Sequence, residues 1–235
     1  MDAALARAVR DQEITRLCHL TPTRNLVHIV TGKGLAAVED LTADERAVFT
    51  AQDPHRFDQH PGHLSCSIEY PNAWYLRRKK NQLGEATNFR DWVILGIKPD
   101  CLLREGTLFS AGNAAAGGGA SLQGGLQGFA ALFADTVTDG AGRTFRRERN
   151  HLRACPTNEQ AEVMVYAGIP LEEVTTIFLA DTEQAARVYE GLKQIGAEAG
   201  RFHYVIAPEF FNPYQLSKKL RNGIDPTEIK WKAPG

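Results

Sequence analysis

Short apolar segments, separated by few and irregularly spaced helical patterns, constrain the fold of this chain more than any other feature. Strand patterns lie at residues 14–20, 64–70, 91–97, 161–166, 175–179 and 203–207, and the clearest helical patterns lie at 2–12 and 182–195. A doubly wound sheet would alternate strands and helices regularly, and this sequence does not. It therefore predicts an α+β fold in which the continuous apolar segment 91–97 is a central strand.

Turn and cap residues divide the rest of the chain. Thr21 and Pro22 precede an apolar stripe, which predicts a helix that is capped by Thr21 and stops at Gly32. Residues 110–128 are rich in Gly and Ala without periodicity, which is typical of an irregular or mobile connection. We expect a single domain over residues 1–235, with a short N-terminal helix and a C-terminal tail from about residue 222.

Composition excludes several classes of protein. The formal net charge of the 235 residues is −1, so any attraction to phosphate must come from local clusters of charge. No segment has the length of a membrane span, and the charged N-terminal helix lacks the apolar run of a signal peptide, so we expect a cytoplasmic protein. The four cysteines are scattered without a C-x-x-C pair, which favours small buried side chains over structural zinc.

A carboxylate in the strand pattern 161–166 is the first candidate for a functional residue. Alternation places Glu162 on the same face as Met164 and Tyr166, opposite the face of Val163. A charge held on such a face costs free energy unless it is paired, which favours a site residue. The alternative is an edge-strand glutamate that faces water.

Two further segments combine side chains that bind small polar ligands. His19 ends a strand pattern and is followed by Thr21 and Asn25, whose donors and acceptors suit a sugar or a carboxamide. The alternative is a buried core histidine beside an N-cap threonine. Arg56 can bind a pyrophosphate through two hydrogen bonds, or it can pair on the surface with Asp58.

Two basic clusters are candidates for contact with nucleic acid. One precedes the strand of Glu162 and comprises Arg143, Arg146, Arg147, Arg149, His151 and Arg153; the other follows Trp74 and Tyr75 and comprises Arg77, Arg78, Lys79 and Lys80. Such runs are usually solvated faces. Their positions, beside a candidate carboxylate and beside aromatic side chains, favour the phosphates and bases of a single strand as ligands.

Five short motifs follow one another along the chain. They are His19-Leu20-Thr21, Asn25-Leu26, the turn Gly32-Lys33-Gly34-Leu35, Tyr70-Pro71-Asn72, and Gln160-Ala161-Glu162-Val163-Met164-Val165-Tyr166. In this order, over roughly residues 14 to 205, they resemble the DNA ADP-ribosyltransferase toxins of the DarT type. The segment 65–75 departs from the thymidine-modifying members, and Arg56-Phe57-Asp58 with Tyr70-Pro71-Asn72 looks closer to the branch that modifies guanosine.

The resemblance implies an ADP-ribosyltransferase-like fold, in which a split, bent β-sheet with peripheral helices surrounds an NAD-binding cleft. It implies that Glu162 is the catalytic glutamate, that His19 and Thr21 hold the nicotinamide side and the ribose hydroxyls, and that Asn25 supports them. Arg56 is expected near the phosphates or the acceptor base, as a second catalytic residue beside Glu162, and Tyr70 is expected among the contacts to NAD. NAD is then a co-substrate, and no metal is required.

The implied activity is transfer of ADP-ribose from NAD to a base of single-stranded DNA, with guanine favoured over thymine. A carboxylate suits this reaction because breaking the bond between nicotinamide and ribose develops positive charge on the sugar. A base inside a duplex is out of reach, which favours a single strand. The alternatives are a transferase or NAD glycohydrolase acting on RNA, protein or water, and a non-catalytic nucleic-acid-binding module.

The resemblance also implies a partner. A monomeric toxin of this kind is expected to have a cognate antitoxin that reverses the mark, either a macrodomain or a NADAR-type ADP-ribosyl hydrolase.

Overall fold

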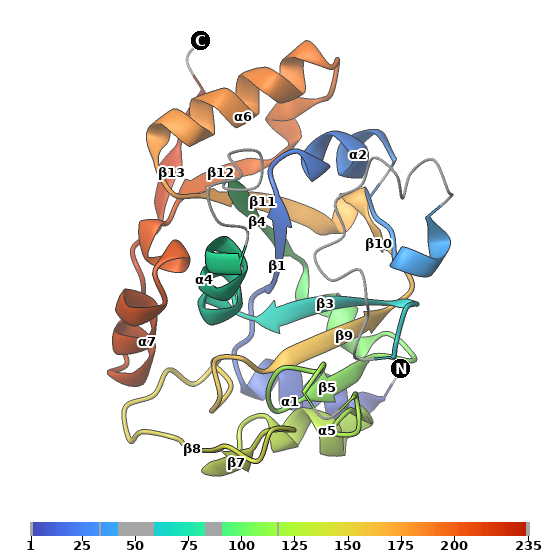
Figure 1. Cartoon of the computed structure of the whole chain (residues 1–235), viewed down its shortest axis with the longest axis vertical. Helices are drawn as coiled ribbons and strands as arrows, with labels where there is room; N and C mark the ends of the chain where they lie inside the picture. Colours follow the sequence, from blue (N-terminus) through green and yellow to red (C-terminus); the bar gives the residue numbers. More distant parts are fainter. Residues whose placement is uncertain (1, 33, 42–58, 83–90, 117, 234–235) are drawn as a thin grey trace.

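One large mixed sheet dominates the computed structural model, which describes residues 2–32, 34–41, 59–82, 91–116 and 118–233. Within these ranges nine strands follow the order β13-β12-β11-β4-β1-β3-β9-β5-β6 (Figure 1). They are β1 (Leu17–Pro22), β3 (His63–Ile68), β4 (Trp92–Ile97), β5 (Leu108–Ser110), β6 (Gln123–Gly124), β9 (Glu162–Tyr166), β11 (Val174–Leu179), β12 (His203–Ile206) and β13 (Ile229–Trp231). Only β11 and β12 pair in parallel among these neighbours. The predicted α+β class is confirmed.

Helices lie around the sheet, and α4 covers part of one of its faces (Figure 1). The α-helices of the described ranges are α1 (Ala3–Asp11), α2 (Asn25–Thr31), α4 (Ala73–Gln82), α5 (Gly125–Ala131), α6 (Thr182–Gln194) and α7 (Pro213–Arg221), and short 3-10 turns include η1 (Val38–Asp40), η3 (Pro99–Leu103), η4 (Leu171–Glu173), η5 (Ala199–Arg201) and η6 (Pro208–Phe211). Two small two-stranded units pair β2 (Gly34–Leu35) with β10 (Ile169–Pro170) and β7 (Thr136–Thr138) with β8 (Thr144–Arg146).

The sheet divides between β1 and β3. β1 pairs with β3 only through Leu17 with Ile68 and Cys18 with Ser67, whereas it pairs with β4 as far as Pro22. Beyond Cys18 the two strands separate, and β3 continues beside β9 across the direction of β1 (Figure 1). The split that the family resemblance implies is therefore present.

Two apolar clusters cover the two faces of the sheet. The larger contains Leu17 with Val163 and Val165 of β9, and the smaller contains Cys18 with Phe210. Adjacent residues of β1 thus enter different clusters, as the alternation of a strand requires. β4 is buried along its whole length between β1 and β11, so the predicted central strand is confirmed.

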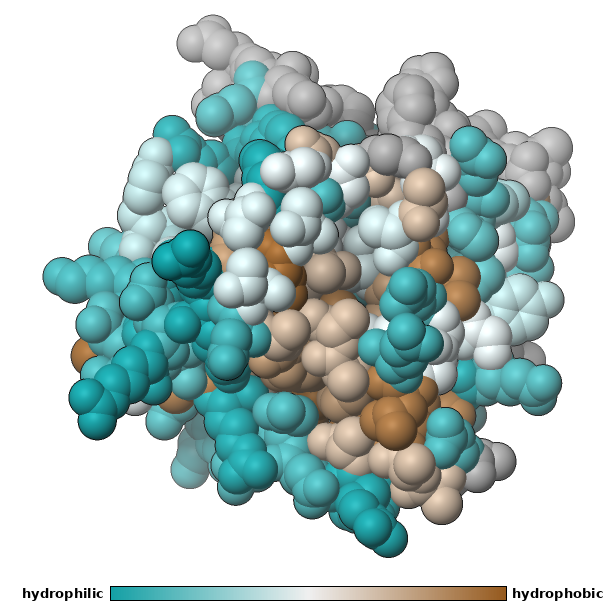
Figure 2. Space-filling view, turned by 90° about the horizontal axis from the view of Figure 1, so that it is seen from below, coloured by the Kyte–Doolittle hydropathy of each residue, from teal (hydrophilic) through white to brown (hydrophobic). Residues whose placement is uncertain are grey.

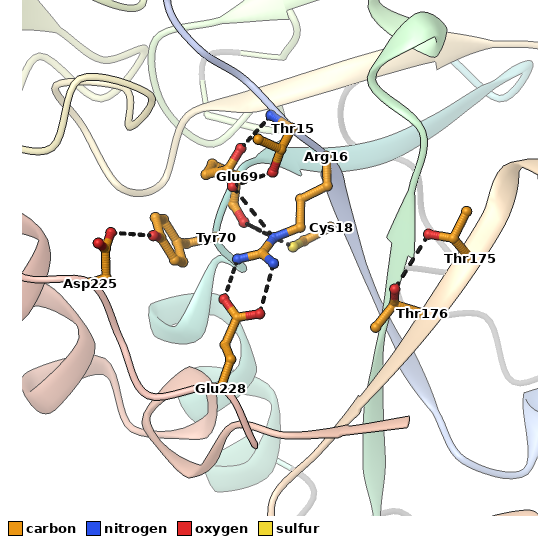
Figure 3. Close-up of polar contacts among 9 residues, drawn as sticks. All are labelled: Thr15, Arg16, Cys18, Glu69, Tyr70, Thr175, Thr176, Asp225 and Glu228. Carbon is orange, nitrogen blue, oxygen red and sulfur yellow. Dashed lines mark hydrogen bonds and ion pairs between the residues drawn. The ribbon is translucent and has the colours of Figure 1, made fainter. Parts of the chain in front are cut away.

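Arg16, the residue before β1, ties this strand to the C-terminal segment (Figure 3). Its guanidinium donates to the backbone carbonyl oxygen of Glu69 and to both carboxylate oxygens of Glu228. It also lies 4.9 Å from the centroid of the Phe178 ring, where the cation and the ring face attract each other. The Glu69 carboxylate accepts hydrogen bonds from the N–H and the hydroxyl of Thr15. The start of β1 is therefore fixed from both sides just before the split.

Two expectations about local structure are wrong. Thr21 does not cap a helix: it lies in β1, fully buried, and α2 begins at Asn25. Pairing of Thr21 with Val93 of β4 prevails over its preference for a cap. The Gly- and Ala-rich stretch 110–128 is not irregular throughout, because it contains β6 and the first turn of α5, which is anchored by Phe129.

Seen from the end where α1 and α5 lie, the surface carries an apolar area that hydrophilic side chains border (Figure 2). None of the described helices has the length and apolar character needed to cross a membrane.

The segment after residue 222 adds β13 to the edge of the sheet beside β12, so this part of the expected tail is ordered by strand pairing.

Candidate active site

Glu162 occupies the first position of β9, between β3 and β5. Its partner across the ladder on β5 is Ser110. The side chain is half-buried, and its Oε2 accepts a hydrogen bond from the Ala114 N–H at 3.2 Å. Because β9 is an inner strand of the sheet, the alternative of an edge-strand glutamate is wrong.

His19 reaches across the split in the sheet. Its Nδ1 lies 2.9 Å from the carbonyl oxygen of Ser65 on β3, and the residue is 8% exposed. Burial lowers the pKa of His19, and the bond to Ser65 opposes that shift. A carbonyl oxygen can only accept, so Nδ1 carries the proton and Nε2 of the neutral ring is an acceptor. Ser65 pairs with Met164 of β9, so a single strand separates His19 from the strand of Glu162.

Thr21 and Asn25 lie on the same side of the split as His19, further along β1 and at the start of α2. Both are fully buried, and the Asn25 Nδ2 donates to the Thr21 hydroxyl at 3.2 Å. The hydroxyl keeps its own proton to donate. The structure therefore joins the two side chains that the sequence pattern proposed as partners.

Glu159, three residues before Glu162, has a different environment. Its carboxylate accepts hydrogen bonds from the Ser217 hydroxyl at 2.8 Å, the Arg221 Nε at 2.9 Å and the Trp74 Nε1 at 3.3 Å. These partners belong to α4 and α7. Glu159 thus fixes the chain that enters β9 against two helices, a role that the sequence reading did not identify.

The basic cluster before β9 divides into buried and exposed members. Arg147 donates to the carbonyl oxygens of Leu152, Arg153 and Cys155, at 2.9, 3.2 and 2.8 Å. His151 is 8% exposed, and within the described ranges neither of its ring nitrogens has a hydrogen-bond partner. Arg146, Arg149 and Arg153 are exposed. The segment therefore folds around Arg147 and directs the other arginines outward.

The pKa of His151 falls from 6.5 to about 4. Burial is the main cause, the positive charges of Arg147 and Arg221 add to it, and Glu159 opposes it. His151 is therefore neutral at pH 7.

The second basic cluster lies on α4 and stacks on aromatic rings. The Arg77 guanidinium lies 4.7 Å from the centroid of the Tyr214 ring on α7 and donates to its hydroxyl. Arg78 and Lys79 lie 5.6 and 5.4 Å from the centroid of the Tyr75 ring. Arg77, Arg78 and Tyr214 are exposed, so this surface presents cations and π-faces together to solvent.

The structure describes one of the two other expected NAD contacts. Arg56 lies outside the described residues. The Tyr70 hydroxyl donates to Asp225 at 3.3 Å, as Figure 3 shows, and its ring packs edge-on against Phe210. Tyr70 also lines a small cavity, of about 10 Å³, that Ser67, Glu159 and other residues border.

The cysteines and the acidic side chains do not suggest other chemistry. Burial raises the pKa of the Cys66 thiol well above its usual value, and the charge of Glu162 adds to the shift, so this thiol is protonated and a poor nucleophile. In the ranges that the structure describes, no group of three or more His, Cys, Asp or Glu residues could hold a metal ion.

Solved structures share this arrangement of strands. The chain resembles Thermus sp. 2.9 DarT in complex with ADP-ribosylated ssDNA (17% identity, TM-score 0.58, covering 85% of this chain and 97% of that chain) and in complex with NAD+ (19%, 0.56, 85% and 98%). It also resembles Thermosipho africanus DarTG in complex with ADP-ribose (15%, 0.55, 84% and 51%). No curated protein sequence matches the chain. The fold is that of an ADP-ribosyltransferase.

A family model gives the more specific assignment. The model described as "ssDNA thymidine ADP-ribosyltransferase, DarT" matches residues 18–212, which is most of the chain. The chain therefore belongs to the DarT family, NAD-dependent enzymes that transfer ADP-ribose to single-stranded DNA.

Proposed function

We propose that this protein transfers ADP-ribose from NAD to a base of single-stranded DNA with Glu162 as its catalytic carboxylate. The observation that supports this best is the setting of Glu162 in a member of the DarT family. It is a half-buried glutamate on an inner strand, held by the Ala114 N–H and one strand away from His19.

The reaction follows from the charge that the carboxylate brings. The bond between the nicotinamide nitrogen and the ribose C1′ breaks, and nicotinamide leaves with the electron pair. The positive charge that develops on the ribose is stabilised by Glu162 through a ribose hydroxyl. A ring nitrogen of the base then forms the new bond to C1′, and Glu162 accepts the proton that this nitrogen loses.

The NAD contacts that we propose lie around the split. The Nε2 of His19 would accept a hydrogen bond from a ribose hydroxyl, since its Nδ1 is engaged by Ser65. Thr21 offers a hydroxyl that Asn25 orients. Arg56 would bind the phosphates or the acceptor base. Tyr70 would contact NAD at the small cavity that Tyr70 and Ser67 both line.

The DNA contacts that we propose use the two basic clusters. Arg77 and Arg78 on α4, beside exposed aromatic rings, suit a strand whose phosphates and bases are both accessible. Arg146, Arg149 and Arg153 would bind phosphates on the approach to β9. Arg147 and His151, which are turned inward, would act on DNA by shaping this segment.

The acceptor base is the finer part of the proposal. The family description names thymidine. The sequence resemblance favours guanine, on residues 56–58, which lie outside the described ranges, and on residues 70–72. The family description makes thymine the first base to test and guanine the second.

A partner that removes the modification would complete the system. One of the similar structures is that of a DarTG protein bound to ADP-ribose. We propose that this chain acts as a monomeric toxin with a cognate ADP-ribosyl hydrolase, a macrodomain or a NADAR-type enzyme. Incubating modified DNA with each class of hydrolase distinguishes the two.

Mass spectrometry of nucleosides tests the proposed activity. Single-stranded DNA, duplex DNA, RNA and a protein mixture are incubated separately with the chain and NAD, and the nucleic acids are digested. We expect an ADP-ribosyl nucleoside from single-stranded DNA, with the modified base identified by its mass. Label on RNA or protein alone, release of free ADP-ribose alone, or binding of DNA without consumption of NAD would contradict the proposal.

A further inference from the structure

The loop that follows β5 passes directly beside Glu162. β5 ends at Ser110, opposite Glu162, and the chain then continues through Ala111 and Gly112 to Ala114, which is fully buried. The Ala114 N–H donates to the Glu162 Oε2 at 3.2 Å. The position of this loop, residues 111–114, therefore sets the direction of one oxygen of the carboxylate.

Asn158 holds the loop from the side of β9. Its side chain is 1% exposed, its Nδ2 donates to the Ala111 carbonyl oxygen at 2.9 Å, and its Oδ1 accepts from the Gln160 N–H at 3.0 Å. A carbonyl can only accept and an N–H can only donate, so one orientation of the amide satisfies both bonds. The Asn158 amide links the loop to the turn that leads into Glu162.

Asp139 lies against the loop next to Asn158. A Cβ added to Gly112 would lie 2.5 Å from the Cβ of Asp139 and 3.2 Å from the Nδ2 of Asn158, so the two residues leave no room for a side chain at this point of the loop. Asp139 is itself held by the Arg143 guanidinium, at 2.7 Å. The loop thus has little freedom to move, and residue 112 must be a glycine because a larger residue would collide with Asp139.

We infer that Asn158 is a positioning residue for the transfer reaction, which acts through the 111–114 loop to orient the Glu162 carboxylate. This inference rests on the proposed catalytic role of Glu162. The Ala114 N–H holds one oxygen of the carboxylate, so a shift of the loop would move the carboxylate relative to the ribose. A displacement of about 1 Å is enough to cost on the order of 100-fold in rate.

Two substitutions test the inference by kinetics. Asn158→Asp keeps the size of the side chain and the acceptor for Gln160, but it replaces the donor to Ala111 with a charged oxygen. Gly112→Ala displaces the same loop, because the added Cβ would lie 2.5 Å from the Cβ of Asp139. We expect each to lower kcat for transfer about 10- to 100-fold while KM for NAD changes less than about twofold. The matched control is Glu159→Gln, which weakens contacts of the adjacent chain to α4 and α7 without touching the loop.

The outcome is read from kcat at a temperature where all variants are folded. A wild-type kcat in Asn158→Asp, an equal loss in Glu159→Gln, or a rise in KM that accounts for the loss would each overturn the inference.

Hydrogen exchange at the Ala114 amide gives a readout that does not depend on activity. We expect slow exchange in the wild type and exchange at least about tenfold faster in Asn158→Asp, with no change in Glu159→Gln. Unchanged exchange in Asn158→Asp would refute the role of Asn158. Faster exchange in a protein that shows no transfer to DNA would instead refute the proposed function and leave the support of the loop by Asn158 intact.

Discussion

Glu159 and Glu162 are two carboxylates on one short segment, and they have opposite environments. Glu159 accepts three hydrogen bonds from side chains of α4 and α7. Glu162 is held by a backbone N–H on β9, one strand away from the division between β1 and β3. We propose that Glu159, whose partners belong to the fold, contributes to stability, and that Glu162 contributes to catalysis. The predictions below test whether the two roles separate in this way.

Glu162→Gln is expected to have the largest effect. The substitution keeps the size of the side chain and removes its charge, so transfer to single-stranded DNA should fall by at least about 10²- to 10³-fold. The rate is measured with labelled NAD, and the increase in melting temperature caused by NAD should persist. Transfer at the wild-type rate by a folded Glu162→Gln protein would refute its catalytic role.

Glu159→Ala is expected to lower stability instead. Loss of the bonds to Ser217, Trp74 and the partly exposed Arg221 should reduce the free energy of unfolding by about 2 kcal/mol. Urea unfolding measures this, and transfer at low temperature should stay within a few-fold of the wild type. A loss of transfer as large as that of Glu162→Gln, in folded protein, would show that the two carboxylates do not have separate roles.

Arg147 and Arg149 extend the comparison to the basic segment. Arg147→Ala leaves three carbonyl oxygens without their donor and should lower the free energy of unfolding by about 1 to 2 kcal/mol. Arg149→Ala should leave stability unchanged and weaken DNA binding. The slope of the logarithm of the binding constant against the logarithm of the salt concentration should become shallower by about 1. Arg187→Ala on α6, an exposed arginine bound to Glu183, is the control. The reverse pattern in the two variants would contradict the assignment.

The smallest effect concerns His151 and is seen only in acid. Because the folded protein lowers its pKa from 6.5 to about 4, the unfolded chain binds more protons between these values, so stability falls as pH decreases through this window. His19 acts in the same direction. Unfolding midpoints measured from pH 7 to pH 4 should fall less in His151→Leu than in the wild type. An equal fall in both proteins would remove His151 as a cause.

The sequence predicted the strands and their faces better than the contacts around the site. The alternation around Glu162 and the central position of segment 91–97 depend on burial, which a local apolar pattern records. Thr21 was misassigned because its strand pairing with Val93 is distant in sequence. The inward turn of Arg147 and the bond of Asn158 to Ala111 could not be predicted, since their partners are carbonyl oxygens that only the folded loops bring near.

A crystal structure of the Glu162→Gln protein with NAD bound tests the central claim most directly. The account predicts that the side chain of residue 162 lies within hydrogen-bond distance, about 2.6 to 3.2 Å, of a hydroxyl on the nicotinamide ribose, with the His19 Nε2 on a ribose hydroxyl. NAD bound with that ribose beyond the reach of residue 162, or bound beside Glu159 instead, would contradict it.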